Sequence, residues 1–423
     1  MTETVVRTSM QAIQGSYTSE RVARVIFQHA ARISNEKEIS VLAELNADLA
    51  RDLTGAERCS LWLLEKNGEL CTRVAHGVKE IRISRGLGIV GICVEQNRPI
   101  IINDAQSDPR FFKGVDSRSG YQTHSIACVP LTNNGEVIGA VQLLNKAGGF
   151  SAEDTELLQL MAVYAAAAIQ SERLRQEAEA AKLFRRELEV AAEVQRRLLP
   201  SIEAGWSGIH VAALCRPARC VGGDFYDLLD LPGGNFGLTL GDVSGKGFPA
   251  AVMMASIHTL LRSLLLHNSS DLAHVLEELN EAIQRNSAAE RYSTLLCGVL
   301  DASRSKLSYV NAGHIPPFIV RSGGSIERPD GANLPAGLLA GIRYQQHEVH
   351  LSPGDLIVCL SDGITEAQDP NGELWEAEAI ERILRQSSGA PVHEILNRLV
   401  QAADDHAGTA EQADDMTVMV LRV

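Results

Sequence analysis

A long stretch without glycine or proline divides this chain into two parts. From Asp154 to Leu199 the sequence contains neither residue and is dominated by Glu, Ala, Arg and Leu, and Pro200 follows directly. Because glycine and proline are the residues that most disfavour a helix interior, about 45 residues without them predict one long helix that ends before Pro200. A chain of 423 residues is too long for one ordinary domain, so we expect a globular domain on each side of this helix.

The composition narrows the class of protein and its partners. The chain is 45% hydrophobic and 22% charged, which is typical of a soluble globular protein, and its formal net charge is -14. This charge argues against nucleic acid or an anionic membrane as a partner. The longest apolar run, 161–169, is far shorter than a membrane span, and no signal-peptide pattern is apparent. The eight cysteines occur singly, without a CxxC pair, so we expect a cytoplasmic protein without a zinc site.

Apolar residues recur along the predicted long helix at spacings of three, four and seven. Spacings of this kind are typical of a coiled-coil seam, although Gln195 also falls on it. Two interpretations stay open. The helix lies on one domain, or it pairs with a second copy of the chain and carries a rotation between the two domains. We favour the second, a homodimer formed through this helix and the domain before it. The seam residues are Leu174, Ala181, Phe184, Leu188, Ala191 and Leu198.

The part before the long helix predicts a compact α/β domain. Leucines at three-to-four spacing predict a helix over 39–53, and strands are expected over 58–65 and 69–75. Two further apolar runs flank the turn 133–135, whose Asn-Gly pair is a strong hairpin signal. A weak helical pattern over 20–32 predicts a helical segment ahead of this domain.

This domain resembles a GAF domain, the small-molecule sensor fold. The motifs that carry the resemblance are GLGIVG at 86–91, PIIINDA at 99–105, ACVPL at 127–131 and GEVIGAVQLLNK at 135–146. Cyclic-nucleotide-binding members of the family carry a further signature, which Asn145, Lys146, Phe150 and Asp154 match, while Thr155 replaces its final glutamate. The resemblance implies these four as candidate ligand-binding residues. A cyclic nucleotide, another small molecule, or a purely structural dimerisation role all stay open.

Four acidic motifs stand beside apolar runs in the part after the long helix. If the neighbouring strands end at one sheet edge, the four aspartates converge there. Anions that gather in this way repel one another and are costly to desolvate, and hard divalent cations remove that cost. Carboxylate oxygens without histidine or cysteine favour Mg²⁺ or Mn²⁺ over zinc. The candidate residues are Asp224 in VGGDFYD, Asp242 after a glycine, Asp362 in SDG, and Asp415 in DDMT.

The order of these motifs resembles the metal-dependent protein phosphatase (PPM) superfamily, in its bacterial SpoIIE-type branch. The matching motifs are VGGDFYD at 221–227, GDVSGKG at 241–247, NAGH at 311–314, SDGITEA at 361–367 and DDMT at 414–417. The resemblance implies a β-sandwich of two antiparallel sheets flanked by helices. The whole chain is then α+β, and its expected segments are a helical segment over 1–36, a GAF domain over 37–155, a helical linker over 156–200 and a PPM domain over 201–423.

The same resemblance implies a reaction and a set of site residues. In the family, two Mg²⁺ or Mn²⁺ ions are bridged by the residue corresponding to Asp242, and the next backbone carbonyl, here that of Val243, is a further ligand. Asp362 and Asp415 complete the first site, and Asp224 acts nearby directly or through water. We take Asp224, Asp242, Asp362 and Asp415 as the candidate catalytic residues. The implied activity is hydrolysis of phosphoserine or phosphothreonine in a protein, and the family context suggests a STAS-type anti-sigma-factor antagonist.

The sequence departs from the eukaryotic branch of the superfamily at the proton donor. Ser244 and Gly245 stand where that branch has a histidine, so water, or His314, would protonate the leaving group. Arg216 and Arg219, just before the first acidic motif, are candidates for binding the substrate phosphate. Three rival functions stay open: a catalytically inactive PPM-fold scaffold, a cyclic-nucleotide-binding regulatory protein, and a second-messenger enzyme.

Overall fold

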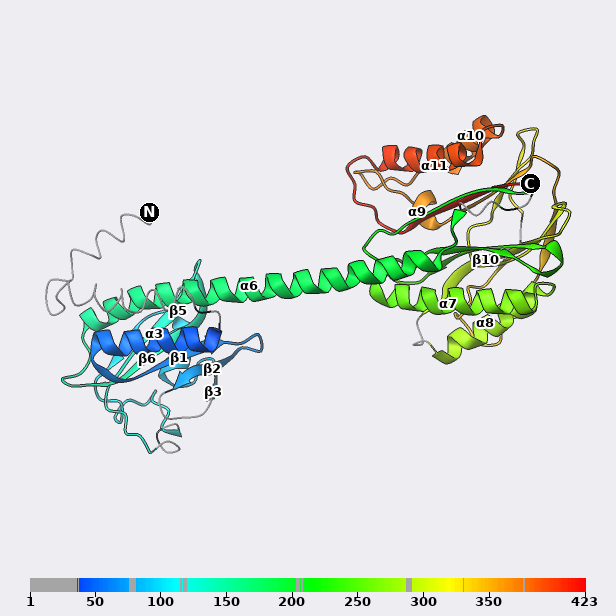
Figure 1. Cartoon of the computed structure of the whole chain (residues 1–423). Coiled ribbons are helices and arrows are strands. Elements are labelled where there is room, and N and C mark those ends of the chain that lie inside the picture. The colour runs from blue at the N-terminus through cyan, green and yellow to red at the C-terminus, as the bar shows by residue number, and fades with distance from the viewer. Residues whose placement is uncertain are drawn as a thin grey trace. The chain divides into compact units, whose positions relative to one another are not determined.

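The structure is a computed structural model, and the chain forms two compact units, Met1–Lys182 and Leu183–Val423, whose boundary falls inside one helix (Figure 1). The helical segment predicted within 1–36 lies outside the described residues, apart from Glu36. The structure describes Glu36 and residues 38–423 except 76–80, 115, 117–119, 203–205, 207, 287–290, 330 and 376.

The first unit is built around one antiparallel sheet with the strand order β3-β2-β1-β6-β5-β4. The predicted hairpin joins β5 to β6 through Asn134 at φ 49° and Gly135 at φ 86°, the left-handed pair that a tight two-residue turn favours. The elements are α3 (Ile39–Thr54), β1 (Ala56–Leu64), β2 (Glu69–Ala75), β3 (Arg82–Ser84), α4 (Gly88–Gln96), β4 (Ile100–Ile102), β5 (Ile126–Asn133) and β6 (Glu136–Lys146).

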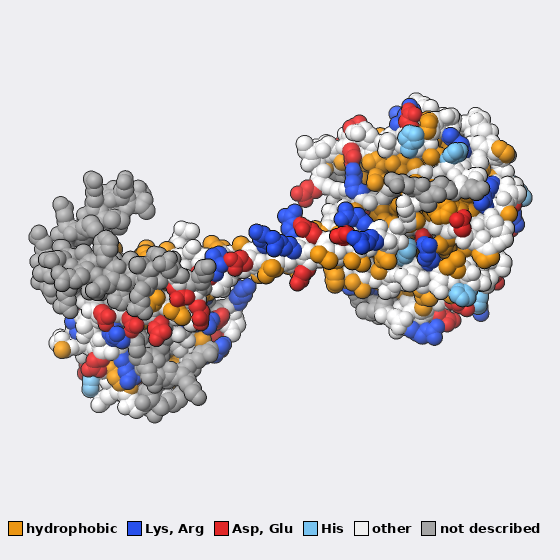
Figure 2. Space-filling model, in the orientation of Figure 1, with side chains coloured by type: hydrophobic (Ala, Val, Ile, Leu, Met, Phe, Trp, Pro, Cys, Tyr) orange, Lys and Arg blue, Asp and Glu red, His pale blue; other side chains and the backbone are white. Residues whose placement is uncertain are grey.

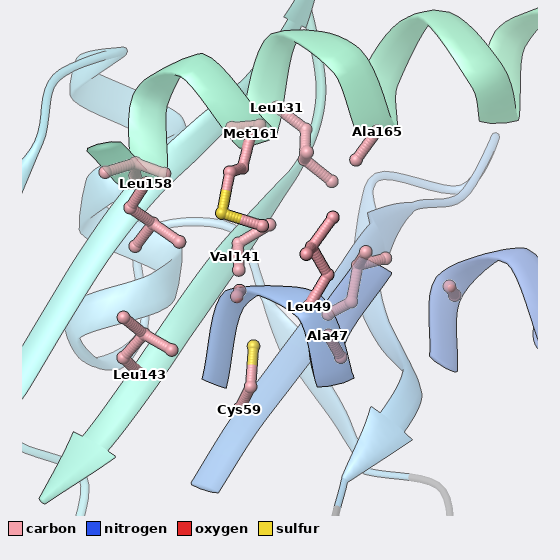
Figure 3. Close-up of a cluster of buried hydrophobic side chains, with 14 of the residues drawn as sticks. Ala47, Leu49, Cys59, Leu131, Val141, Leu143, Leu158, Met161 and Ala165 are labelled. Carbon is pink, nitrogen blue, oxygen red and sulfur yellow. The ribbon is translucent and has the colours of Figure 1, made fainter. Parts of the chain in front are cut away.

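Alternation along β1 divides the apolar residues of this unit between the two faces of the sheet. Cys59, Leu61 and Leu63 point to one face and join a core with α3 and the first turns of the long helix α6 (Ala152–Leu198), as Figure 3 shows for Cys59, Leu143 and Leu158. Trp62, one position out of phase, belongs to a second cluster under α4. Both faces of the sheet are therefore covered.

The helix α6 confirms the prediction made from the stretch without glycine or proline. It begins at Ala152, packs on the first sheet as far as Ile169, and ends at Leu198. Its middle carries opposite charges one turn apart, such as Arg185 with Glu189. Figure 2 shows both basic and acidic side chains along this part of the chain. Apolar seam residues are exposed there, including Leu174 at 56% and Phe184 at 60%.

The second unit is a sandwich of two sheets, which confirms the predicted fold. One sheet has the order β14-β11-β10-β9-β8, with β15 also paired to β11, and the other has the order β13-β12-β16-β17-β7. The strands are β7 (His210–Arg216), β8 (Phe225–Asp230), β9 (Phe236–Val243), β10 (Ser293–Leu300), β11 (Lys306–Ala312), β12 (Phe318–Val320), β13 (Ile326–Glu327), β14 (Ala332–Asn333), β15 (His347–His350), β16 (Leu356–Leu360) and β17 (Met416–Arg422).

Helices cover the outer face of each sheet (Figure 1). α7 and α8 pack on the sheet that contains β9, whereas α10 and α11 pack on the sheet that contains β17. The inner faces share a separate buried cluster that includes Phe236, Tyr309, Ile357 and Met419. The helices are α7 (Phe248–His267), α8 (Leu272–Asn286), α9 (Asp362–Thr365), α10 (Ala377–Ser387) and α11 (Val392–Ala407), and a 3-10 turn, η2, spans Pro232–Gly234.

Among the described residues, α7 alone is long and apolar enough to cross a membrane by length and composition. Its buried face, which includes Met254, Ile257 and Leu261, packs against the sheet. Core helices of globular proteins meet the same length and composition, so the match is weak evidence for a membrane span. The outer side of α7 still exposes Phe248 at 53% and Val252 at 52%.

Candidate active site

Asp224 lies immediately before β8 and directly after a pair of glycines. Its side chain is only 2% exposed, and the Thr417 hydroxyl donates a hydrogen bond of 2.7 Å to Asp224 Oδ2. The glycines permit close contacts that no side chain would allow. A Cβ at Gly223 would lie 2.7 Å from the carbonyl oxygen of Val243, and one at Gly222 would collide with the Asp415 carboxylate. The two glycines therefore bring the loop before Asp224 against two other motifs.

Asp242 is the next-to-last residue of β9 and stands beside Thr294 of β10 in the register of the sheet. Its backbone carbonyl accepts a hydrogen bond of 2.9 Å from the Ser293 hydroxyl. Gly241 is required before it because a Cβ there would meet the side chains of Leu295 and Phe225. Beyond Val243 the chain turns through Gly245 and Gly247, both at positive φ, into α7.

Asp362 and Asp415 are brought together by contacts between β16 and β17. The Ser361 hydroxyl donates to the Asp415 carbonyl oxygen at 3.1 Å and accepts from the Thr417 amide at 2.8 Å. Asp362 begins the short helix α9. Asp415 is 8% exposed, and its carboxylate accepts hydrogen bonds of 2.7 Å from the backbone amides of Ala218 and Gly223.

The electrostatics show that the aspartates of the four motifs influence one another. Burial raises the pKa of Asp224 well above its usual value, and the negative charge of Asp242 raises it further. Burial raises the pKa of Asp242 to about 7, with added effects from Asp362, Asp414 and Asp415. The pKa of Asp362 is raised by burial and then by Asp414. The protein thus gathers carboxylates at a point where their own repulsion opposes ionisation.

The donor set fits a hard divalent cation. The side chains that face one another are carboxylates, the Val243 carbonyl is close by, and oxygen ligands of this kind suit Mg²⁺ or Mn²⁺. Yet no group of three His, Cys, Asp or Glu side chains in the described part of the chain is already arranged as a ready metal site. Two of the carboxylates are not directed at a common point, because they accept hydrogen bonds from the protein itself. Asp224 accepts one from the Thr417 hydroxyl, and Asp415 accepts two from backbone amides.

Three basic residues lie in or beside the acidic motifs, and two of them, Arg216 and Arg219, were predicted to bind the substrate phosphate. Arg216 is engaged elsewhere, since its guanidinium pairs with both carboxylate oxygens of Asp404. Lys246 Nζ donates to the Ala413 carbonyl at 2.6 Å and contacts Asp414 at 2.9 Å, which ties the loop after β9 to the segment before β17. Arg219 makes no ion pair among the described residues, and its Nη1 lies 3.8 Å from the position that a Cβ at Gly247 would take.

His314 is a buried neutral side chain. The Thr294 hydroxyl lies 2.8 Å from the Nδ1 of His314. The side chain of Asn311 forms hydrogen bonds with both the backbone amide and the carbonyl of His314. Burial lowers the pKa of His314 to about 4, so at neutral pH the ring is the neutral imidazole and not the acidic imidazolium. The surroundings of His314 therefore do not favour it as a general acid.

The candidate ligand-binding residues of the first unit form an internal network. Asn145 accepts hydrogen bonds from the backbone amides of His124 and Ser125, and Lys146 Nζ lies 2.6 Å from Asp154 Oδ1. Phe150 is buried in the core between α6 and the sheet. These contacts tie β6 to the start of α6, and none of the four residues lines the cavity that this unit has between its sheet and α4.

One contact at the site was missed from the sequence. The Gln195 side-chain amide, near the end of α6, donates to the Gly222 carbonyl at 2.6 Å and accepts from the Gly222 amide at 3.2 Å. The only sequence signal was a polar residue on an otherwise apolar seam. The contact links α6 directly to the loop that positions Asp224.

Comparison with known proteins shows the family to which this chain belongs. A model of the GAF domain matches residues 38–169, and a model described as Stage II sporulation protein E matches residues 232–423. The phosphoserine phosphatase RsbU of Bacillus subtilis is 30% identical over 243 residues, which cover 56% of this chain and 70% of RsbU. The chain belongs to the RsbU family of phosphatases.

Other relatives extend the comparison of this RsbU-family chain. Protein IcfG of Synechocystis sp. is 27% identical over 263 residues, and the chain spans 41% of its length. The SiaA-PP2C domain of Pseudomonas aeruginosa superposes with a TM-score of 0.53 at 24% identity, over 58% of this chain and 99% of that domain, which supports the fold. The SpoIIE match begins at residue 232, so Asp224 lies ahead of the matched region.

Proposed function

We propose that this RsbU-family chain is an active metal-dependent phosphoprotein phosphatase that removes phosphate from serine or threonine. The observation that carries the proposal is the gathering of Asp224, Asp242 and Asp362 with raised pKa values beside Asp415. Buried carboxylates that repel one another favour binding of an external cation.

Two Mg²⁺ or Mn²⁺ ions would be held by Asp242, the Val243 carbonyl, Asp362 and Asp415, with Asp224 adjacent. When bound, these cations supply Lewis-acid activation of a water nucleophile and neutralise the charge of the phosphate oxygens. Their binding requires ionised carboxylates, so the Asp242 proton must leave first.

The chain's own residues would complete the site. Arg219 would bind the substrate phosphate, because it lies beside the loop after β9 and makes no ion pair in the described part of the chain. Lys246 would brace the loops that carry Asp242 and Asp415 through its contacts with Ala413 and Asp414. Thr417 would orient Asp224. The proton for the leaving group would come from water, because burial keeps the His314 ring neutral.

The substrate we propose is a small phosphorylated regulator of the STAS type, in the cytoplasm. The relative RsbU bears the name of a phosphoserine phosphatase, which supports a phosphoserine substrate here. The assignment to STAS proteins rests on family context alone. A GAF domain over 37–155 and a linker over 156–200 would then report a signal to a phosphatase domain over 201–423.

The linker would act through a homodimer and through Gln195. Three of the six seam residues of α6, Leu174, Ala181 and Phe184, are exposed in a single chain, which supports pairing with a second copy as a coiled coil. Near its end, α6 also borders an apolar groove of about 780 Å³, lined by residues that include Val194, Leu198, Phe248 and Val252. Rotation of the paired helices would move Gly222 through Gln195, and with it Asp224.

The test is hydrolysis by the purified full chain with Mn²⁺, on a phosphorylated STAS protein and on a generic aryl phosphate. We expect release of phosphate from both, abolished by Asp242→Asn and unchanged by Asp230→Asn, which alters an exposed aspartate of β8. Hydrolysis of the aryl phosphate alone would contradict the STAS substrate. No hydrolysis of either, despite bound Mn²⁺, would favour an inactive scaffold.

A further inference from the structure

The GAF domain contains a small cavity on the face of the sheet under α4. Its floor is formed by neighbouring strands, with Ser60 of β1 in register with Gln142 of β6 and Trp62 two positions further along β1. The first residues of α4, Gly88 to Val90, form another wall, and Leu87 and Phe112 stand at 42% and 36% exposure. The cavity measures about 80 Å³.

Several groups of the lining lack a protein partner. Trp62 is 4% exposed, and its Nε1–H finds no acceptor in the described part of the chain. The buried side chains of Ser60 and Gln142 make no hydrogen bond there either. A buried polar group without a partner is costly, so groups of this kind beside a cavity indicate that something polar binds in it.

The lining is rich in donors. Trp62 and Arg58 can only donate hydrogen bonds, and the first amides of α4 have no side-chain cap at Leu87. The Arg58 guanidinium lies 3.8 Å from the centre of the Tyr121 ring and makes no ion pair among the described residues. A helix N-terminus and an arginine at one cavity favour a negatively charged group.

One acidic residue also lines the cavity, and it is already engaged. Asp116 accepts hydrogen bonds of 2.8 Å from the backbone amide and the hydroxyl of Thr123, and a further one from Gln106. The negative charge of Asp116 is therefore directed at the protein's own donors. The donors named above remain available to a ligand.

The size of the cavity limits what can bind. Pockets that enclose drug-sized ligands measure roughly 300–1,000 Å³, well above the cavity here. The cavity therefore favours a ligand smaller than a cyclic nucleotide, which combines a purine, a sugar and a phosphate. The walls are mainly apolar, from Ile81, Ile83, Ile89 and Leu144.

We propose that this cavity binds a small monocarboxylate with an apolar body of about one ring. Its carboxylate would meet Arg58 and the α4 amides, while Trp62 and Gln142 would bind from the floor. This site is independent of the phosphatase activity, since binding can be measured without any substrate turnover. The proposal also replaces a cyclic nucleotide as the ligand of this domain.

The test is calorimetric titration of the full chain with benzoate as the probe, beside benzamide as its uncharged counterpart. We expect one benzoate per chain with a dissociation constant of about 1 mM or tighter, and benzamide at least about tenfold weaker, as loss of a charge-assisted hydrogen bond implies. Arg58→Met should remove this difference. Trp62→Phe should weaken both probes about fivefold.

Arg98→Met, which removes an exposed arginine outside the cavity lining, is the matched control and should bind benzoate as the unaltered chain does. Circular dichroism confirms that each variant is folded, and Arg58 is half-exposed, so its replacement should not unfold the domain. Three results would overturn the proposal: no saturable benzoate binding, equal affinity for benzamide, or displacement of benzoate by cyclic GMP.

Discussion

Two buried aspartates, one in each unit of the molecule, show how differently this chain treats a carboxylate. Asp154 is fully buried, and the Lys146 ammonium, the Ser151 amide and the Ser151 hydroxyl all bind it. Asp224 is also buried, but the hydrogen bond that it accepts comes from the neutral hydroxyl of Thr417, and its neighbours Asp242 and Asp415 carry the same charge. The first carboxylate has its own counter-ion, whereas the second requires one from outside.

The difference separates a structural residue from a candidate metal ligand, although the sequence made both aspartates candidate binding residues. An internal ion pair stabilises the fold only while both partners remain, because removing one leaves a buried charge. Like charges around Asp224 destabilise the metal-free fold and favour cation binding. Asp154→Asn should therefore destabilise the protein, whereas Asp224→Asn should stabilise the metal-free protein.

The largest effect is expected for Asp224→Asn on catalysis. We expect a fall in kcat/KM of about 10³-fold with Mn²⁺, because an amide binds a hard cation poorly and the site loses a charge. The metal-free variant should be more stable than the unaltered chain. Steady-state kinetics and thermal unfolding without metal check both parts. Lower thermal stability of the metal-free variant would contradict the expectation that Asp224, unlike Asp154, destabilises the metal-free fold.

Asp154→Asn should act on stability alone. Loss of this charge leaves Lys146 without its partner, and we expect the GAF domain to lose about 3–5 kcal/mol. Denaturant unfolding followed by circular dichroism measures the loss, and Mn²⁺ affinity per folded chain should not change. Unchanged stability would mean that the ion pair does not stabilise the domain. Glu153→Gln, which alters an exposed neighbour on α6, is the control and should leave the stability unchanged.

The pH dependence of the metal-free protein should reveal Asp242. Its pKa in the folded chain is raised to about 7, above the ordinary value of 3.8, so the folded state holds the proton more tightly than the unfolded state. Stability should therefore fall as pH rises from about 4 to about 7, by roughly 2 kcal/mol after allowance for partial exposure. Asp242→Asn should flatten this slope in unfolding experiments across that range. An equal slope in the variant would show that other groups cause the pH dependence of stability.

The smallest effect is expected for Gln195→Leu. This change keeps the side-chain volume but removes both hydrogen bonds to Gly222, so the loop before Asp224 loses its tie to α6. We expect a change in kcat of about fivefold, with the Mn²⁺ affinity also altered. Gln176→Leu, on the exposed middle of the same helix, should change neither quantity. Identical kinetics in both variants would show that the Gln195 contact does not couple α6 to the active site.

Much of the fold could be predicted because its signals are local. The absence of glycine and proline predicts α6, and the Asn-Gly pair predicts the turn between β5 and β6. The meeting of the four acidic motifs could be inferred only by assuming that strands end at one edge. Their ligand and catalytic roles stay predictions.

What the sequence could not show depends on three-dimensional contacts between distant residues. Arg216 and Arg219 looked equivalent, and only the fold pairs Arg216 with Asp404, 188 positions away. The Gln195 contact with Gly222 likewise spans 27 positions. The cavity beside Trp62 has no motif at all, because its lining comes from the three strands β1, β3 and β6, the helix α4 and the segments between elements.

The central claim is that the carboxylates around Asp224 and Asp242 require an external cation. The most direct measurement is the thermal unfolding midpoint of the phosphatase domain in the full chain, with and without saturating Mn²⁺, for the unaltered chain and for Asp242→Asn. At 100 times the dissociation constant, Mn²⁺ should add about 2.7 kcal/mol to the unaltered chain and much less to the variant, which should start out more stable. An equal effect of Mn²⁺ on both, or none on either, would contradict the account.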